Sequence, residues 1–276
     1  MLPIYYINLA NRTDRRAQME AQFDLLGLGA TRIEAVNPLD MVGRLSHRGW
    51  FRNHFPGLSP EALASLLSHA IVLDYIAAGS EPWSLVLEDD AVLSRDLPDF
   101  LIRAEAELPA GLDLVRLEAG YRPARLGREN VVKRGPVAIR PLQSAQEGAG
   151  AYLIRPHAAR RLLKALPKTG LTLEDCLFGR AGWGLYALSI GQTVPALSIQ
   201  LNKSPRDRAH PAARADMSPN RPVPTRGFRR ALRRQARALA LFARDWQHFG
   251  SPVLWDEKAE IGFADFRLAP VRPAGA

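Results

Sequence analysis

Apolar residues gather in short runs along the first two hundred positions, separated by polar segments. Residues 2–9 form a nearly continuous run rich in Ile and Tyr, which is typical of a strand buried on both faces in a parallel sheet. Further runs of strand length lie at residues 31–36, 83–87, 112–117, 137–142 and 185–190. We expect these runs to form the strands of one buried sheet.

Three other segments are predicted to be helices, residues 13–26, 60–78 and 156–166, and the second carries apolar positions at helical spacing. Thr13 is the expected N-cap of the first, which Gly27 and Gly29 end, and Ser59-Pro60-Glu61 is a strong start for the second. Gly148-Ala149-Gly150 predicts a tight turn where the backbone approaches another part of the molecule. Strands that alternate with helices predict an α/β fold with right-handed crossovers.

The composition, with 47% hydrophobic and 24% charged residues over 276 positions, excludes a chain that is disordered throughout. No basic residue precedes the first apolar run, so we expect no secretory signal, and no apolar segment approaches the roughly 18 to 20 residues of a membrane span. The single cysteine, Cys176, excludes an intramolecular disulfide and a metal site built on cysteines.

The net charge of +9 is concentrated in one segment. Residues 1–202 carry 22 Lys and Arg against 21 Asp and Glu, residues 203–244 carry 12 against 2, and residues 245–276 carry 3 against 5. The chain therefore divides into a near-neutral body at 1–204, a proline-rich tether at 205–225, and a basic amphipathic helix and tail at 226–276.

In the basic segment, apolar residues at helical spacing are interleaved with arginines. The apolar residues are Phe228, Leu232, Leu239, Phe242 and Trp246. We favour an interfacial helix at residues 226–246 that lies on an anionic membrane surface, which would place the protein in the cytoplasm, peripheral on the inner face of the cytoplasmic membrane. The alternative is a helix that packs its apolar stripe on the body. Nucleic-acid binding is not expected, because nothing resembles a known nucleic-acid module.

Three consecutive carboxylates, Glu88-Asp89-Asp90, follow the strand predicted at 83–87. Their repulsion and desolvation require a compensating cation, and Mn²⁺ or Mg²⁺ is the simplest one. Strand alternation places Glu88 and Asp90 on one side and Asp89 on the other. We expect Asp90 to be a direct metal ligand and Glu88 to hold a second metal position or a ribose hydroxyl. The alternative is a solvated loop whose acids pair with an arginine such as Arg95.

The turn after the first strand offers four polar residues, Asn8, Arg12, Asp14 and Arg15, at the same end of the predicted sheet. Arginines and helix N-terminal amides suit a phosphate or a nucleotide base. Taken alone, the segment also fits a solvated surface helix. Together with the three carboxylates it indicates a site for a nucleotide diphosphate, since ligands of open α/β sheets bind at the carboxyl ends of strands.

Several blocks, in order, resemble glycosyltransferase family 25, the lipooligosaccharide and lipopolysaccharide glycosyltransferases related to collagen galactosyltransferases. The similarity covers residues 3–204. Its blocks are Ile7-Asn8-Leu9 with Arg12, Asp14 and Arg15; Leu66-Leu67-Ser68-His69; Leu85 to Asp90; and Gly150 to Ile154 with Ala158 and Leu162-Leu163. The resemblance implies a GT-A fold for residues 1–204, a UDP-sugar donor, a divalent metal held through an Asp-X-Asp type of motif, and inversion at the anomeric carbon.

An inverting transfer also needs a general base. The family carries a late acidic position after a proline; here the segment reads Leu171-Thr172-Leu173-Glu174-Asp175-Cys176, without the proline. Position favours Asp175 as the base, with Glu174 as the other candidate, and an acid that interacts with a helix dipole is the alternative. We expect His69 to be a hydrogen-bonded core histidine. Gln200 and Ser204 resemble the Gln and Ser that end the family's catalytic region.

These features predict an enzyme that moves a hexose, galactose or glucose, from a UDP-sugar to a glycan acceptor of the lipooligosaccharide type. One alternative is a catalytically degenerate protein that binds a membrane or nucleic acid through its basic segment. Another is a metal-dependent phosphoryl or nucleotidyl transferase, which would release pyrophosphate rather than UDP.

Overall fold

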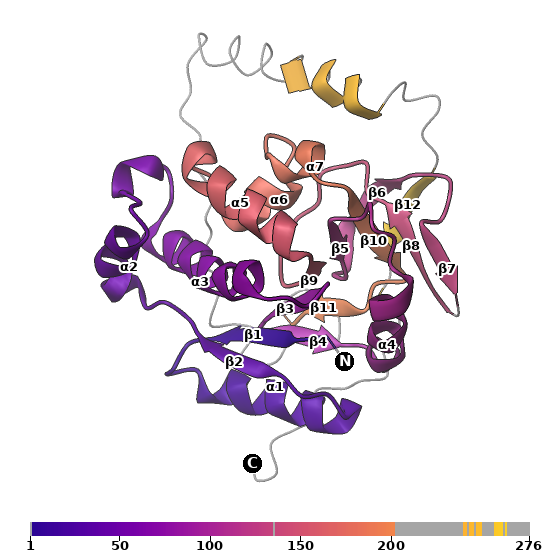
Figure 1. Cartoon of the computed structure of the whole chain (residues 1–276), viewed down its shortest axis with the longest axis horizontal. Helices are drawn as coiled ribbons and strands as arrows, with labels where there is room; N and C mark the ends of the chain where they lie inside the picture. Colours follow the sequence, from indigo (N-terminus) through magenta and orange to yellow (C-terminus); the bar gives the residue numbers. More distant parts are fainter. Residues whose placement is uncertain are drawn as a thin grey trace.

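The computed structural model describes residues 2–134, 136–201, 240–241, 243–245, 247–249, 257–261 and 263 of the chain. At its centre is an eight-stranded sheet in the order β2-β1-β3-β9-β5-β10-β8-β7 (Figure 1). The strands are β1 (Ile4–Asn8), β2 (Thr31–Glu34), β3 (Ser84–Glu88), β5 (Leu114–Arg116), β7 (Val132–Arg134), β8 (Val137–Pro141), β9 (Ala151–Ile154) and β10 (Ile190–Val194).

The first three strands form the parallel half of the sheet. β1 lies between β2 and β3 and pairs with both in parallel, so that Tyr5 is opposite Thr31 on one side and Val86 on the other. A strand with neighbours on both sides and helices on both faces is buried throughout, which explains its almost unbroken apolar sequence. The strands predicted at 2–9, 31–36 and 83–87 are confirmed.

The sheet is mixed rather than wholly parallel. β9 runs antiparallel to both β3 and β5, and β8 runs antiparallel to β10 and β7, so these two strands oppose the other six. The α/β class is therefore confirmed, and so is the parallel setting predicted for the first strand, while the two reversed strands make the whole sheet mixed. Tyr152 of the reversed strand β9 lies opposite Val86 of β3 and Arg116 of β5.

Helices cover both faces of the sheet and bury two separate cores. Val86 packs into one core with residues of α3 (Pro60–Ala78) and α5 (Pro156–Thr169). Its neighbours Leu85 and Leu87 point the other way, into a core with residues of α1 (Thr13–Leu26) and α4 (Leu97–Glu107). The alternation of side chains along β3 thus joins the two layers, which Figure 1 shows on opposite sides of the sheet.

The three predicted helices are confirmed. Ser59 caps α3 by accepting a hydrogen bond from the Ala62 amide at 3.2 Å, whereas α1 begins at Thr13 without a side-chain cap and ends at Gly27, whose φ is 64°. By length and composition alone α3 is apolar enough to cross a membrane, contrary to the sequence expectation. Ten of its nineteen residues are buried inside the protein, as expected of a core helix.

One predicted strand, at residues 185–190, is wrong in its first half. Gly184–Ala187 forms the short helix α7, and β10 begins only at Ile190. The cause lies in the backbone before it. A Cβ atom at Gly182 would lie 2.1 Å from the Asp175 carbonyl oxygen, and one at Gly184 would lie 2.7 Å from that of Leu177. Two glycines therefore let this segment pack on α6 (Leu173–Phe178), a contact that apolar periodicity does not reveal.

The described C-terminal residues pack on the body. β12 (Glu257–Ile261) pairs antiparallel with β6 (Gly120–Leu126). Asp245 accepts hydrogen bonds from Arg180 and Tyr186. The predicted tether at 205–225 and the arginines of the predicted helix between 226 and 237 lie outside the described residues, so the proposed division of the chain stays a prediction.

Candidate active site

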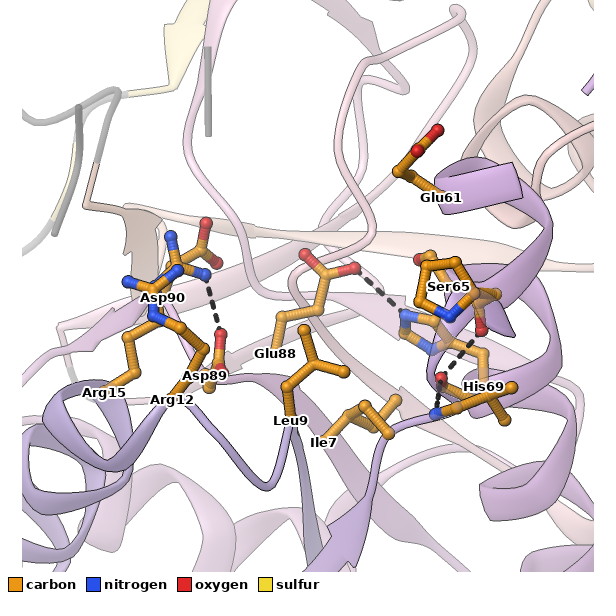
Figure 2. Close-up of a pocket in the computed structure, with 15 residues that line it drawn as sticks. Ile7, Leu9, Arg12, Arg15, Glu61, Ser65, His69, Glu88, Asp89 and Asp90 are labelled. Atoms are coloured by element: carbon orange, nitrogen blue, oxygen red, sulfur yellow. Dashed lines mark hydrogen bonds and ion pairs between the residues drawn. The ribbon is translucent and has the colours of Figure 1, made fainter. Parts of the chain in front are cut away.

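A cavity of about 330 Å³ opens where β1 and β3 end, between α1 and α3. Its volume is within the range of small-ligand sites. The charged residues that line it are Arg12, Arg15, Glu61, Glu88, Asp89 and Asp90 (Figure 2). The structure thus brings together the carboxylate triplet and the two arginines, which are far apart in the sequence and which we predicted to meet at this edge.

The triplet lies at the turn between β3 and the three-residue strand β4 (Ala91–Leu93), which pairs with β11 (Ser198–Gln200). Two contacts fix this turn. The Leu201 amide donates to the Asp90 carbonyl at 2.8 Å, and Gln22 of α1 binds the Ala91 carbonyl and the Leu93 amide at 3.0 and 2.8 Å. The turn that carries the acids is therefore held both by α1, near the start of the chain, and by the residue that follows β11.

Asp89 is committed to a buried network. Its two oxygens accept hydrogen bonds from Arg15 Nη1 and Asn8 Nδ2, both at 2.8 Å. Desolvation raises the pKa of this carboxyl, and the Arg15 guanidinium opposes the rise. Asn8 is itself buried and also accepts from Arg32 Nε at 3.0 Å. Asn8 therefore holds Asp89 in place and does not line the cavity, and its predicted contact with the donor stays a prediction.

Asp90 differs sharply from Asp89. It is buried, yet its Oδ1 atom has no hydrogen-bond partner within the described residues. Burial raises the pKa of Asp90 to about 8, and the neighbouring charge of Glu88 adds to the rise. An acid with a buried unbonded oxygen beside two other carboxylates is a site that a cation would stabilise. The residues present therefore fit the metal predicted from the sequence.

The protein would contribute few ligands to such a metal. Within the described ranges, His, Cys, Asp and Glu nowhere form a group of three or more with metal-site geometry. Mg²⁺ and Mn²⁺ tolerate this, because they bind through one or two carboxylates and complete their shell with water and substrate phosphate oxygens. Asp90 and Glu88 are the two carboxylates that would serve.

Glu88 is held from two sides. Its Oε1 atom lies 3.0 Å from His69 Nε2, and its Oε2 atom accepts from Gln200 Nε2 at 3.2 Å (Figure 2 shows the contact with His69). We predicted a core histidine at position 69: it is buried at 2% exposure, but it also lines the cavity. The neighbouring Ser68 accepts from the Val36 amide at 2.8 Å and donates to the Ala64 carbonyl at 2.7 Å, which fixes another wall of the cavity.

Arg12 and Asp14 form a separate pair at the mouth. Arg12 binds both oxygens of Asp14 through Nε and Nη2, each at 3.0 Å, and this contact lowers the pKa of Asp14. Arg12 lines the cavity, whereas Asp14 does not and its side chain is 53% exposed. Asp14 thus orients the arginine, and its predicted contact with the donor stays a prediction.

A buried charged pair, Arg116 and Glu118, was not predicted from the sequence and supports the loop that contacts Glu88 of the triplet. Arg116 and Glu118 are both fully buried, and Glu118 accepts from the Gly150 amide at 2.9 Å. Gly148 has a φ of 91°, and a Cβ there would lie 2.2 Å from Glu118 Oε1. The predicted close-approach loop is therefore confirmed. It also reaches the site, because the Glu88 amide donates to the Gly150 carbonyl at 2.9 Å.

The family model described as "Glycosyltransferase family 25 (LPS biosynthesis protein)" matches residues 1–177, more than half of the chain and all of the cavity-lining residues. The chain belongs to glycosyltransferase family 25. It is therefore a glycosyltransferase of the lipopolysaccharide-biosynthesis type. The GT-A fold that the resemblance implied stays a prediction beyond the α/β class described above.

Curated relatives cover the same region. The lacto-N-neotetraose biosynthesis glycosyltransferase LgtE of Neisseria meningitidis serogroup B is 25% identical over 207 residues, which are 71% of this chain and 73% of that protein. LgtB of Neisseria gonorrhoeae is 27% identical over 204 residues, with the same coverage. Among solved structures, a glycosyltransferase involved in glycosylation of the major capsid of PBCV-1 aligns with a TM-score of 0.40 and 9% identity, over 75% of this chain and 95% of that one.

The two candidate bases of this family 25 protein lie outside the cavity. Glu174 and Asp175 are in the first turn of α6, where Thr172 Oγ1 accepts from the Asp175 amide at 3.0 Å. Asp175 is exposed and Glu174 half-buried, and neither lines the cavity. This placement fits the helix-dipole alternative for Asp175, and the role of either residue as base stays a prediction.

Proposed function

We propose that this protein is an inverting glycosyltransferase that moves a hexose, galactose or glucose, from a UDP-sugar to a lipooligosaccharide-type acceptor with the help of Mn²⁺ or Mg²⁺. The observation that carries the proposal is the cavity itself. It combines a buried acid with an unbonded oxygen, Asp90, with two arginines at the carboxyl ends of parallel strands. The names of the Neisseria relatives support a glycan acceptor of this class.

Each group of the cavity has a distinct part in this proposal. Asp90 and Glu88 would hold the divalent metal, which supplies neutralisation of the charge that develops on the departing diphosphate. Arg12 contributes a second positive charge at the mouth, where Asp14 holds its guanidinium. Arg15 acts indirectly, since it keeps Asp89 in place beside Asp90.

The proton of the acceptor hydroxyl needs a carboxylate within hydrogen-bond reach. We propose Asp175, with Glu174 as its substitute, so that the acceptor bridges from the cavity to α6. In this arrangement the hydroxyl oxygen bonds to the anomeric carbon, the bond from that carbon to the UDP oxygen breaks, and the proton passes to the carboxylate.

A binding titration tests the donor. We expect UDP-galactose or UDP-glucose to bind in the presence of Mn²⁺ and to be released by a chelator, as measured by calorimetry, with UDP and UDP-N-acetylglucosamine as comparisons. Binding of no UDP-sugar, with or without metal, would contradict the proposal. Release of pyrophosphate instead of UDP would favour the nucleotidyl transferase alternative.

One observation favours a second candidate, a degenerate protein that binds but does not transfer. Neither Glu174 nor Asp175, the two candidate bases, lines the cavity. This candidate predicts metal-dependent binding of UDP without release of UDP from any UDP-hexose, in the presence or absence of glycan acceptors.

We also propose that the basic segment holds the enzyme on the anionic inner face of the cytoplasmic membrane. The support is the charge of residues 203–244, which include 12 basic residues and only 2 acidic ones. Arg244 is already engaged, because its guanidinium stacks on Tyr186 at 3.7 Å. The arginines between residues 226 and 237 would therefore make the lipid contacts, at about 1 kcal/mol each. Flotation with vesicles that contain or lack phosphatidylglycerol tests this.

A further inference from the structure

Glu88 owes its orientation to a chain of buried groups that begins on another strand. Tyr152 of β9 is fully buried, and its hydroxyl lies 3.1 Å from His69 Nδ1. The two rings also stack, with centroids 6.0 Å apart and planes inclined by 24°. On its other side the imidazole reaches Glu88 Oε1 through Nε2 at 3.0 Å. Tyr152, His69 and Glu88 therefore form a continuous line from the core to the cavity (Figure 2 shows its last step).

The partners assign the tautomer of His69. Burial raises the pKa of Tyr152, so its hydroxyl keeps its proton and can donate it to His69, whereas an ionised Glu88 carboxylate on the other side of the ring can only accept. Among the described residues, His69 Nδ1 is the acceptor that this hydroxyl reaches. Nδ1 then carries no hydrogen, and the imidazole hydrogen is on Nε2, where it can only donate to Glu88.

The second oxygen of Glu88 is held independently, by Gln200 of β11 at 3.2 Å. Donors on both oxygens restrict the orientation of the carboxylate. The side chain of Glu88 is 28% exposed and lines the cavity. A group held in this way is pre-organised for a ligand, as carboxylates at metal sites commonly are.

We propose that His69 is a positioning residue for donor binding, which Tyr152 locks in the Nε2–H tautomer so that Glu88 faces the donor and its metal. This inference rests on the proposed function, because it assigns the residues that prepare that same site. It assigns His69, which we predicted to be only a core residue, to the donor site as well. It also gives the Tyr152 hydroxyl, at the centre of the sheet, a role that packing alone would not require.

The test compares four variants by calorimetric titration of the metal-free protein with UDP and Mn²⁺. His69→Phe keeps an aromatic ring but removes both nitrogens, and we expect the dissociation constant to rise about 10- to 100-fold. Tyr152→Phe removes the hydroxyl that fixes the tautomer of His69, and we expect the dissociation constant to rise by a smaller factor, about 2- to 10-fold. His69→Gln keeps an N–H donor for Glu88 and should restore part of the loss.

Tyr6→Phe is the matched control. It also removes the hydroxyl of a tyrosine in the core. This hydroxyl donates to Glu20 at 3.2 Å, and neither residue lines the cavity, so the variant should leave the dissociation constant unchanged. With a transfer assay, the His69 and Tyr152 variants should raise the KM for the UDP-sugar and leave the KM for the acceptor unchanged. A role confined to stability would lower the melting temperature without this selective change.

The outcomes separate the two proposals. If the unaltered protein binds UDP and Mn²⁺ but His69→Phe and Tyr152→Phe bind equally well, the positioning role is wrong and the proposed function stands. If the unaltered protein binds no UDP, the proposed function is wrong and the inference fails with it. Should His69→Phe not fold, the graded comparison of His69→Gln, Tyr152→Phe and Tyr6→Phe still decides, because equal affinities in all three overturn the inference.

Discussion

Two acidic segments of this chain look alike in sequence and differ in structure. Glu88-Asp89-Asp90 ends a buried strand and lines a cavity, whereas Glu174-Asp175 begins a six-residue helix and lies outside that cavity. Asp89 and Asp90 of the first set are buried, so each needs a specific partner, and one oxygen of Asp90 lacks one among the described residues. Asp175 meets solvent and a helix N-terminus. The comparison teaches that burial, more than residue type, marks the acids that are prepared for a ligand.

The largest expected effect on activity separates donor binding from transfer at these two segments. Asp90→Asn removes the negative charge of the predicted metal ligand, so metal-dependent UDP-sugar binding should weaken by more than about 100-fold, or roughly 2.7 kcal/mol. Asp175→Asn should leave donor affinity nearly intact and abolish transfer. Calorimetry and a UDP-release assay on both variants make this measurement.

Two results would break this contrast. An Asp90→Asn protein with normal metal-dependent activity would contradict the ligand assignment. An Asp175→Asn protein with normal transfer would remove Asp175 as the base, and Glu174→Gln would then be the variant to measure.

The next effect concerns stability and the buried partner of Asp89. Arg15→Met keeps most of the side-chain volume but leaves Asp89 buried without its cation; the side chains of this ion pair are 8% and 11% exposed. Removing one member of such a pair costs about 3 to 5 kcal/mol. Urea unfolding should show this loss. Arg12→Met is the matched control, because its partner Asp14 is mostly exposed, and we expect it to lose less than about 1 kcal/mol.

A third effect is the pH dependence of stability that Asp90 creates in metal-free protein. Its pKa rises from 3.8 to about 8 on folding, so between these values the folded state holds a proton that the unfolded state has lost. Stability must then fall as the pH rises through this window, and it levels off above about pH 8.

Asp90→Asn should remove most of this fall, which is on the order of a few kcal/mol at about 1.4 kcal/mol per pKa unit. Urea unfolding at pH 5.5 and pH 9 in the presence of a chelator compares the two proteins. Equal slopes for both would show that Asp90 is not the desolvated acid. The slope that remains in the variant reports Asp89, whose pKa is also raised.

The local parts of this fold could be predicted from the sequence, and the non-local parts could not. The apolar run around β1 and the start of α3 at Ser59 are set by neighbours in the chain, and both were predicted. The direction of β9 depends on strands that precede it by more than thirty residues, so nothing in Ala151–Ile154 itself reveals the reversal.

The same distinction holds at the site. The triplet was found because three adjacent acids are visible in the sequence, whereas the roles of His69 and Gln200 depend on contacts across 19 and 112 positions. The apolar spacing of α3 correctly predicted that His69 is buried, but it could not show which group the imidazole meets. The sequence did contain one indication that His69 belongs to the site, because the family resemblance includes the block Leu67-Ser68-His69.

The smallest effect tests the other side of the comparison, the exposed acid on α6. If Asp175 interacts only with the helix N-terminus, Asp175→Asn should lose about 0.3 to 1 kcal/mol of stability, and the loss should shrink in high salt. Thr172→Ala, which removes the hydroxyl that caps the Asp175 amide, should lose about 0.5 to 2 kcal/mol without that dependence on salt. Urea unfolding of both variants at low and high ionic strength makes the measurement. A loss of several kcal/mol on Asp175→Asn would mean that this acid has a buried role comparable to that of Asp89, and the contrast between the two acidic segments would be wrong.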